Sequence, residues 1–248
     1  DNGADLVETA FLIQGLLTAR QFFSADNNTE REIRETINRM WREVEWDWFR
    51  KTPEGEVLYW HWSPNYEWAM NFPVEGYNEC MITYVLAAAS PTHGIPAEVY
   101  HEGWARSGGI KNDPGHSQYG YHLDLKHNGA VQFGGPLFWA HYSYLGLDPR
   151  KLKDRYADYW QHNKNHTLIN RQHCVLNPKG YKGYGEDCWG LTASYSIGFY
   201  AAHNPAEDLG VISPTAALSS MPYTPKESMK VLRYMYNKLG DKVFGEFG

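Results

Sequence analysis

The chain has 248 residues, of which 42% are hydrophobic and 21% charged, as in ordinary globular proteins. Its net charge is −6 and its lysines and arginines form no cluster, which argues against nucleic acid as a partner. No apolar run approaches the roughly 20 residues of a membrane-spanning helix. The unusual feature is aromatic content: 10 Trp, 18 Tyr and 10 Phe. This excess indicates either a site that stacks flat ligands or a core built from large side chains.

Apolar spacing predicts helices of two kinds in alternation. Residues 4–23 are apolar nearly all round, so we expect a helix buried on every side, whereas residues 28–50 are amphipathic and begin at Asn28 or Thr29. The later segments continue the alternation: an apolar helix over 78–89, a short amphipathic one over 95–106, an inner one over 133–146, a long outer one over 149–175, short inner helix ends over 187–196 and 213–221, and an amphipathic helix over 224–240.

Alternating inner and outer helices predict an all-α fold, a toroid of helix pairs. Only four or five pairs can be counted, so we expect one domain over residues 1–248, an incomplete toroid truncated at both ends. The connections are long and rich in glycine, proline and aromatic residues, which is typical of functional loops. We expect a short strand at Val57–Trp62. The main connections span residues 51–77, 107–132 and 177–190.

The cysteine count is low and odd. Cys80, Cys174 and Cys188 do not form the pattern of a disulfide scaffold. Free thiols are the favoured interpretation, and a single bridge between Cys174 and Cys188 is the alternative. No signal peptide is visible, but the sequence does not begin with Met, so a leader could have been removed.

An aromatic stretch over residues 59–79 ends in an acid, Glu79, directly before an apolar helix. Sugar faces stack on aromatic rings, and cleavage of a glycosidic bond needs a proton donor. The helix N-terminus would lower the pKa of Glu79, whereas desolvation by Trp62, Trp68 and Tyr77 would raise it. The sequence leaves this balance open. The alternative is a buried aromatic cluster beside a helix-capping acid.

Three further acids recur at helical spacing near the start of the chain. Asp1, Asp5 and Glu8 fall at i, i+4 and i+7, so they share one face, and like charges at close range raise each other's pKa. An ordinary acidic first turn is the alternative. Other chemistries have weaker signals, because HExxH, paired CxxC and GxSxG motifs are absent. The glycine-rich run KGYKGYG lacks the Lys-Ser/Thr of a phosphate loop. We interpret it as a mobile loop that brings side chains to a substrate: Tyr181, Lys182, Tyr184 and Glu186.

Five segments in order resemble one family: YWHWSPNYEWAMNFPVEGYNE, YVLAAASPTHGIP, GGPLFWAHYS, NPKGYKGYGEDCWGLTAS and PTAALSSMPYTPKESMKVLRYMY. The sequence is similar to the glucoamylase-like proteins of Bacteroidetes, glycoside hydrolase family 144, which includes endo-β-1,2-glucanases and sophorose-releasing enzymes. The resemblance implies an (α/α)6 barrel, an inverting mechanism, no cofactor or metal, a glucan or gluco-oligosaccharide substrate, and export to the periplasm or secretion. It also implies further chain on both sides of these residues.

The same resemblance assigns roles to individual residues. Glu79 matches the acid of a WNE-type motif, with Tyr77 where Trp is common, and would be the general acid. Asp1, Asp5 or Glu8 would activate water, directly or through the substrate. Two other functions stay open, an exo-acting glucoamylase-type α-glucosidase and a non-catalytic glycan-binding protein. The candidates for stacking on sugars are Trp60, Trp62, Trp68, Phe138, Tyr142 and Trp189. The candidates for binding sugar hydroxyl groups are His141, Arg171, Lys182 and Glu186, and Tyr77 is a further substrate-binding candidate.

Overall fold

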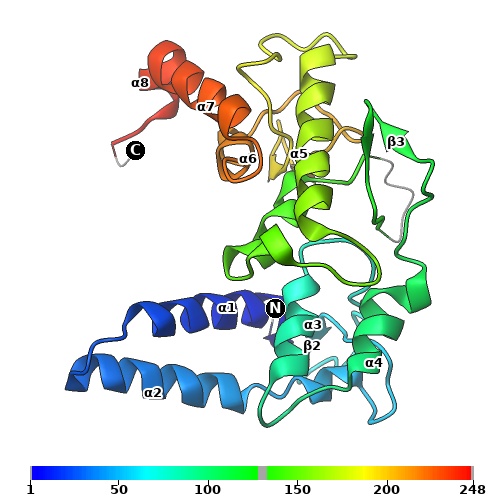
Figure 1. The fold of residues 1–248 in the computed structure, drawn as a ribbon, viewed down its shortest axis with the longest axis vertical. Coiled ribbons are helices and arrows are strands. Elements are labelled where there is room, and N and C mark those ends of the chain that lie inside the picture. The colour runs from blue at the N-terminus through cyan, green and yellow to red at the C-terminus, as the bar shows by residue number, and fades with distance from the viewer. Residues whose placement is uncertain (1, 128–132, 247–248) are drawn as a thin grey trace. The chain divides into compact units, whose positions relative to one another are not determined.

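The computed structural model describes residues 2–127 and 133–246, which fall in two compact units. Unit 1 contains the chain up to residue 110 together with residues 142–148, and unit 2 contains residues 111–141 and 149 onward. Helices dominate both units, and the strands are two or three residues long (Figure 1). The predicted helical fold with short strands in long connections is therefore confirmed.

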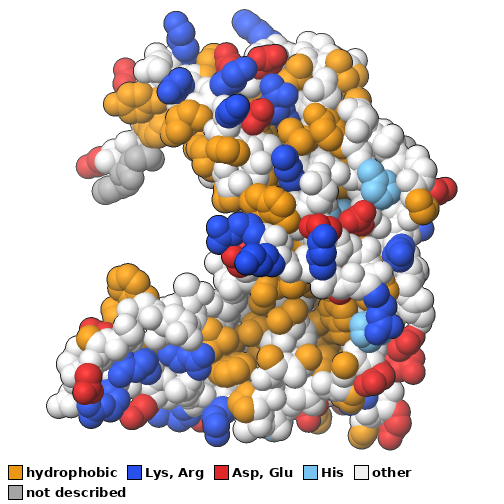
Figure 2. All heavy atoms as spheres, viewed as in Figure 1, with side chains coloured by type: hydrophobic (Ala, Val, Ile, Leu, Met, Phe, Trp, Pro, Cys, Tyr) orange, Lys and Arg blue, Asp and Glu red, His pale blue; other side chains and the backbone are white. Residues whose placement is uncertain are grey.

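Unit 1 is built on an antiparallel helix hairpin. The first helix, α1 (Leu6–Phe22), is capped by the Asp5 side chain, and α2 (Asn28–Glu43) is capped by Asn27, which accepts a hydrogen bond from the Glu30 N–H. Figure 2 shows charged side chains gathered along α2, at the lower left of the view, as expected for an amphipathic helix. The predicted caps at Asn28 or Thr29 are wrong by one or two residues.

Two helix predictions in unit 1 need correction. Burial of α1 on every side is wrong, because its partners in unit 1, chiefly α2 and α3, cover only part of it, and Leu12 is 54% exposed. The helix predicted over 28–50 ends at Glu43, because Val44 takes an extended conformation. A separate 3-10 turn, η1 (Asp47–Arg50), follows and contains Trp48.

The rest of unit 1 surrounds a two-stranded ribbon. Strands β1 (Ala4–Asp5) and β2 (His61–Trp62) pair antiparallel, and an isolated bridge joins Tyr59 to Pro73. Of the residues 57–62 that were predicted to form a strand, only the last two do so, as β2. The remaining elements of unit 1 are α3 (Met81–Ala89), α4 (Ala97–Val99), the π-helix η2 (Tyr100–Trp104), and the 3-10 turns η3 (Arg106–Gly108) and η5 (Tyr142–Leu145).

Unit 2 is organised around α5 (Tyr159–Leu176), which begins at its cap Asp158. Its hydrophobic core joins α5, a buried tryptophan and the C-terminal helices: Leu137, Cys174, Trp189, Leu191, Ala216, Ala217, Val231 and Met235. The other elements are β3 (Ser117–Gln118), β4 (Tyr121–His122), η4 (Leu137–Ala140), η6 (Pro149–Lys151), β5 (Ala193–Tyr195), β6 (Tyr200–Ala202), α6 (Pro214–Ser219), α7 (Pro225–Tyr234), η7 (Met235–Leu239) and α8 (Gly240–Val243).

Three predictions in unit 2 are wrong. The helix over 133–146 is replaced by 3-10 turns, because Gly134 and Gly135 have φ of 91° and 92° and Pro136 is extended. The segment 187–196 contains strand β5 instead of a helix end. The outer helix over 149–175 is in fact α5, and its polar residues are largely buried.

Candidate functional site

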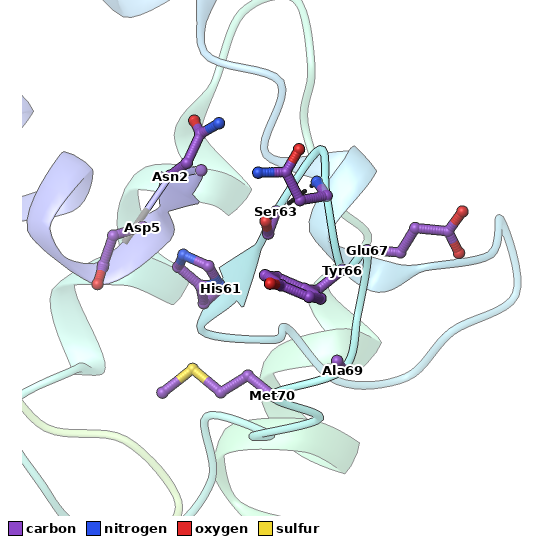
Figure 3. A pocket seen from close by; sticks show the side chains of 10 residues that line it. Asn2, Asp5, His61, Ser63, Tyr66, Glu67, Ala69 and Met70 are labelled. Carbon is purple, nitrogen blue, oxygen red and sulfur yellow. Dashed lines mark hydrogen bonds between the residues drawn. The ribbon is translucent and has the colours of Figure 1, made fainter.

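A pocket of about 650 Å³ lies in unit 1 beside the β1–β2 ribbon (Figure 3). Asn2, Asp5 and His61 lie on one side of it in the close-up view, and Tyr66 and Met70 belong to the loop that follows β2. The pocket lining thus includes two carboxylates, Asp5 and Glu67, an imidazole and amides together with an exposed aromatic ring. The lining residues are Asn2, Gly3, Asp5, His61, Ser63, Asn65, Tyr66, Glu67, Ala69 and Met70.

The register of the ribbon sorts its side chains between two hollows. Asp5 pairs with His61, and both line this pocket. Ala4 pairs with Trp62, and both line a separate hollow of about 430 Å³. Successive strand residues point to opposite faces, so this division follows from the one-residue offset. Trp62 therefore does not share the pocket of Asp5.

Asp5 is held by two hydrogen bonds. Its Oδ1 accepts the Glu8 backbone N–H at 2.9 Å, which makes it the N-cap of α1. Its Oδ2 accepts the indole N–H of Trp60 at 3.0 Å. Each oxygen of a carboxylate can accept about two hydrogen bonds, so each keeps room for one more partner. Asp5 is both a structural cap and a carboxylate that lines the pocket.

Glu79 lies two residues before α3, and burial dominates its chemistry. Burial raises the pKa of this carboxyl group to about 7, and the negative charge of Glu8 also raises it. A hydrogen bond from the Glu79 backbone N–H lowers this pKa, but by less than burial raises it. The balance that the sequence left open is therefore decided by desolvation. A carboxyl group with this pKa is protonated in a large fraction of molecules near neutral pH, as a general acid requires.

The acids gather around the start of α3. The Cys80 thiol is fully buried, and its pKa is raised by burial and by the charges of Glu79, Asp5 and Glu8. These three carboxyl groups, 74 residues apart at the extremes by number, thus all lie near enough to Cys80 to act on its thiol. Glu8 is exposed and does not line the pocket. The fourth candidate, Asp1, lies outside the described residues.

The aromatic candidates of unit 1 have different surroundings. Trp62 and Trp68 both contact Trp48, at ring separations of 6.2 and 6.4 Å. Tyr142 is exposed and meets Phe11 edge-on. Tyr77 is only 1% exposed. Its predicted contact with substrate is incompatible with this burial, because the side chain has almost no accessible surface.

The candidates in unit 2 are also divided by burial. Trp189 has no exposed surface and belongs to the core, so the stacking role predicted for it is wrong. His141 is buried, stacks on Tyr223 and bonds to Ser220, and burial lowers its pKa to about 3, so it is neutral. Phe138 and Arg171 are half-buried.

The predicted mobile loop is partly anchored. Tyr181 and Tyr184 both donate to Asp208, the first to its carbonyl oxygen at 3.2 Å and the second to its carboxylate at 2.8 Å. Lys182 is exposed. Glu186 is exposed too and bonds to Lys230 at 2.9 Å, a contact that lowers the pKa of this carboxyl group. The two tyrosines are thus held in the fold.

The sequence reasoning missed the polar lining of the pocket, chiefly His61 and Asn65. Only their positions in the sequence could have indicated these residues. His61 lies between two tryptophans of the aromatic stretch, and Asn65 follows in the same loop. Within the described ranges, no group of three or more His, Cys, Asp or Glu could hold a metal ion, and all three cysteines are free. Over the same residues, no helix is long and apolar enough to cross a membrane.

Comparison with known proteins places this geometry in a family. The model of a family described as "Glycoamylase: Putative glucoamylase" matches residues 71–248. The chain belongs to this glucoamylase family. The predicted resemblance is thereby confirmed.

Solved structures of similar proteins have the same fold over this chain. An endo-β-1,2-glucanase from Chitinophaga pinensis, solved with sophorotriose and glucose, is 63% identical with a TM-score of 0.95, covering 99% of this chain and 58% of its own. A "putative glucoamylase" from Bacteroides caccae is 59% identical with a TM-score of 0.95, covering 100% and 59%. The two proteins are named for different substrates. The family description alone is therefore a weak guide to which glycosidic linkage is cleaved.

A curated relative extends the comparison. The exo β-1,2-glucooligosaccharide sophorohydrolase (non-reducing end) of Parabacteroides distasonis is 46% identical, covering 100% of this chain and 36% of its own. The chain thus spans somewhat more than half the length of the solved relatives and about a third of the curated one.

Proposed function

We propose that the protein is a glycoside hydrolase that cleaves β-1,2-glucan or its oligosaccharides by general acid/base catalysis with inversion. The observation that carries the proposal is Glu79, a carboxyl group whose pKa burial raises to about 7 and which, like the pocket carboxylate Asp5, acts on the neighbouring Cys80 thiol. Two carboxyl groups, one protonated and one ionised, are the minimum equipment for this reaction. The names of two relatives, a β-1,2-glucanase and a sophorohydrolase, support the linkage.

In this proposal Glu79 protonates the glycosidic oxygen as the bond to the leaving sugar breaks. Asp5 takes a proton from the attacking water, directly or through a substrate hydroxyl group. Asp5 is preferred to Glu8 as the base because Asp5 lines the pocket, whereas Glu8 is exposed. Glu79 does not line the pocket either, and it is assigned as the acid on its burial and raised pKa. The phenol ring of Tyr66, 74% exposed, would stack on a sugar face, and His61 and Asn65 would bond to hydroxyl groups.

Further substrate contacts remain proposals. Trp62, Trp68, Tyr142 and Phe138 supply aromatic surface, and Arg171, Lys182 and Glu186 supply polar groups. Export to the periplasm or secretion is also proposed, on the resemblance to the family alone. Cell fractionation with an antibody against the protein would test the location, and recovery only with cytoplasmic markers would reject it.

An exo-acting α-glucosidase is the second candidate within the hydrolases, favoured by the family description as a glucoamylase. A glycan-binding protein without activity is the candidate of another class. Incubation with β-1,2-glucan and, separately, maltodextrin distinguishes all three by release of reducing sugar. Release only from maltodextrin would support the α-glucosidase, and affinity for glucan without release would support the binding protein.

The variant Glu79→Gln tests the assignment of the acid. We expect at least a ~100-fold loss of turnover on β-1,2-glucan, because the amide cannot donate the proton. Glu35→Gln, at an exposed position on α2, is the matched control and should retain wild-type turnover. Near-normal turnover of Glu79→Gln would reject the role of Glu79.

A further inference from the structure

Trp60 donates its indole N–H to the carboxylate of Asp5 at 3.0 Å. The sequence had assigned this tryptophan to sugar stacking. However, Trp60 is half-buried and is not part of the pocket lining, whereas its acceptor Asp5 is. The polar edge of the indole is thus directed at a proposed catalytic group.

The position of Trp60 is fixed from several directions. The backbone carbonyl oxygen of Trp60 accepts the Leu6 backbone N–H at 2.9 Å. The backbone N–H of Trp60 donates to the carbonyl oxygen of Phe72 at 2.9 Å. Its ring packs against the Phe72 ring at 5.5 Å between centroids. Leu6 is the first residue of α1, so the backbone of Trp60 is tied to the helix that Asp5 caps. Side chains locked by packing are suited to holding a catalytic group in place.

We propose that Trp60 is a positioning residue that orients the Asp5 carboxylate for catalysis. This inference rests on the proposed function. The indole N–H holds Oδ2 and the Glu8 N–H holds Oδ1, so rotation about the bond between Cβ and the carboxyl carbon would break both contacts. The carboxylate plane is therefore fixed, and the remaining lone pair on each oxygen has a defined direction. A base that activates water depends on such alignment, because small misplacements cost large factors in rate.

The variant Trp60→Phe tests this role, because it keeps an aromatic ring and removes only the donor. We expect kcat on β-1,2-glucan to fall about 10- to 100-fold, with KM changed by less than about threefold. The acidic limb of the pH–rate profile should move to higher pH, since the ionised carboxylate loses a donor. Trp41→Phe, on α2, is the matched control and should keep wild-type kinetics and pH profile.

A double-mutant cycle with Asp5→Asn separates positioning from stacking. If Trp60 acts through Asp5, Trp60→Phe should have little further effect once Asp5 is an amide. A mainly increased KM that persists in the Asp5→Asn background would instead reveal a stacking residue and overturn the inference. Circular dichroism spectra of all variants establish that they are folded, and Trp60→His, which retains a ring N–H, should recover part of the lost kcat.

The outcomes distinguish this inference from the proposed function. A folded wild-type protein that releases no sugar from any glucan would reject both. An active wild-type protein whose Trp60→Phe variant has unchanged kcat and pH profile would reject the positioning role alone.

Discussion

The hydroxyl group of Ser143 donates a hydrogen bond to the backbone carbonyl oxygen of Glu79, 64 residues away in the chain. The same hydroxyl oxygen accepts the Ile82 N–H at 3.1 Å, and Ser143 is fully buried. One side chain from η5 thus holds both ends of the turn that leads from Glu79 into α3. The N-cap residue of α3, Cys80, makes no side-chain hydrogen bond to the first turn of the helix. The contact from Ser143 takes the place of this cap.

Ser143→Ala should therefore destabilise the protein and reduce its activity. The buried Ile82 N–H and the Glu79 carbonyl group would both lose their partner, at a cost of about 1–3 kcal/mol in the free energy of unfolding. Turnover on β-1,2-glucan should fall about tenfold, because the turn that carries the proposed acid is loosened. Urea denaturation and steady-state kinetics measure the two effects. Ser24→Ala, at an exposed position, is the control, and equal stability of the two variants would contradict this role of Ser143.

Glu79 should also make stability depend on pH. Its pKa in the folded protein, about 7, is above the ordinary value of 4.5, so the folded state binds more protons than the unfolded state between these values. The free energy of unfolding therefore falls as pH rises from about 4.5 to about 7. Glu79→Gln removes this dependence, so the variant should gain stability relative to wild type by up to ~3 kcal/mol between pH 5 and pH 8.

Thermal denaturation across that pH range checks the prediction. The control is Glu35→Gln, whose stability should follow that of the wild type at every pH. Parallel stability curves for wild type and Glu79→Gln would show that the carboxyl group is not desolvated as the structure indicates.

The places of Asp5 and Glu79 just before apolar helices could be inferred from the sequence, because helix starts have local signals. The catalytic roles of these acids stay predictions. The sequence did not show whether the pKa of Glu79 is raised or lowered. The pKa of Glu79 depends chiefly on the burial of the turn and also on the charge of Glu8, which are long-range consequences of the fold.

The errors about helix α5 have a different cause. Its residues His166, Asn170 and His173 are polar, so the sequence pattern indicated a surface helix. All are buried because each finds a partner: His166 bonds to the Gly135 carbonyl oxygen, and Asn170 bonds to both backbone groups of Leu191. A polar side chain can be buried where such partners exist, and its own sequence neighbourhood does not reveal them.

Trp189 illustrates the same limit for aromatic residues. Its burial in the core of unit 2 predicts that Trp189→Ala lowers the free energy of unfolding by about 3–5 kcal/mol, because a large cavity replaces the ring. Trp48→Ala, at a 53% exposed position, should cost much less. Urea denaturation of both variants tests the contrast. If Trp48→Ala were the more destabilising, the assignment of Trp189 to the core would be wrong.

The final prediction concerns the pair of His173 and Asp208, which is nearly inaccessible to solvent. His173 Nε2 lies 2.9 Å from Asp208 Oδ2, and Asp208 Oδ1 accepts the Tyr184 hydroxyl at 2.8 Å. Asp208→Asn should lower the free energy of unfolding by about 2–4 kcal/mol, because the new amide group cannot accept at both positions.

The same change should expose the loop after α5 to proteolysis. The Asp208 carbonyl oxygen also accepts Lys179 Nζ at 2.7 Å, so a displaced Asp208 frees both this lysine and Tyr181. Trypsin should then cleave after Lys179 or Lys182 faster in Asp208→Asn than in wild type. Asp26→Asn, which alters an exposed pair with Arg31, provides the control and should change neither stability nor cleavage appreciably. Equal cleavage rates in the two variants would show that Asp208 does not anchor the loop.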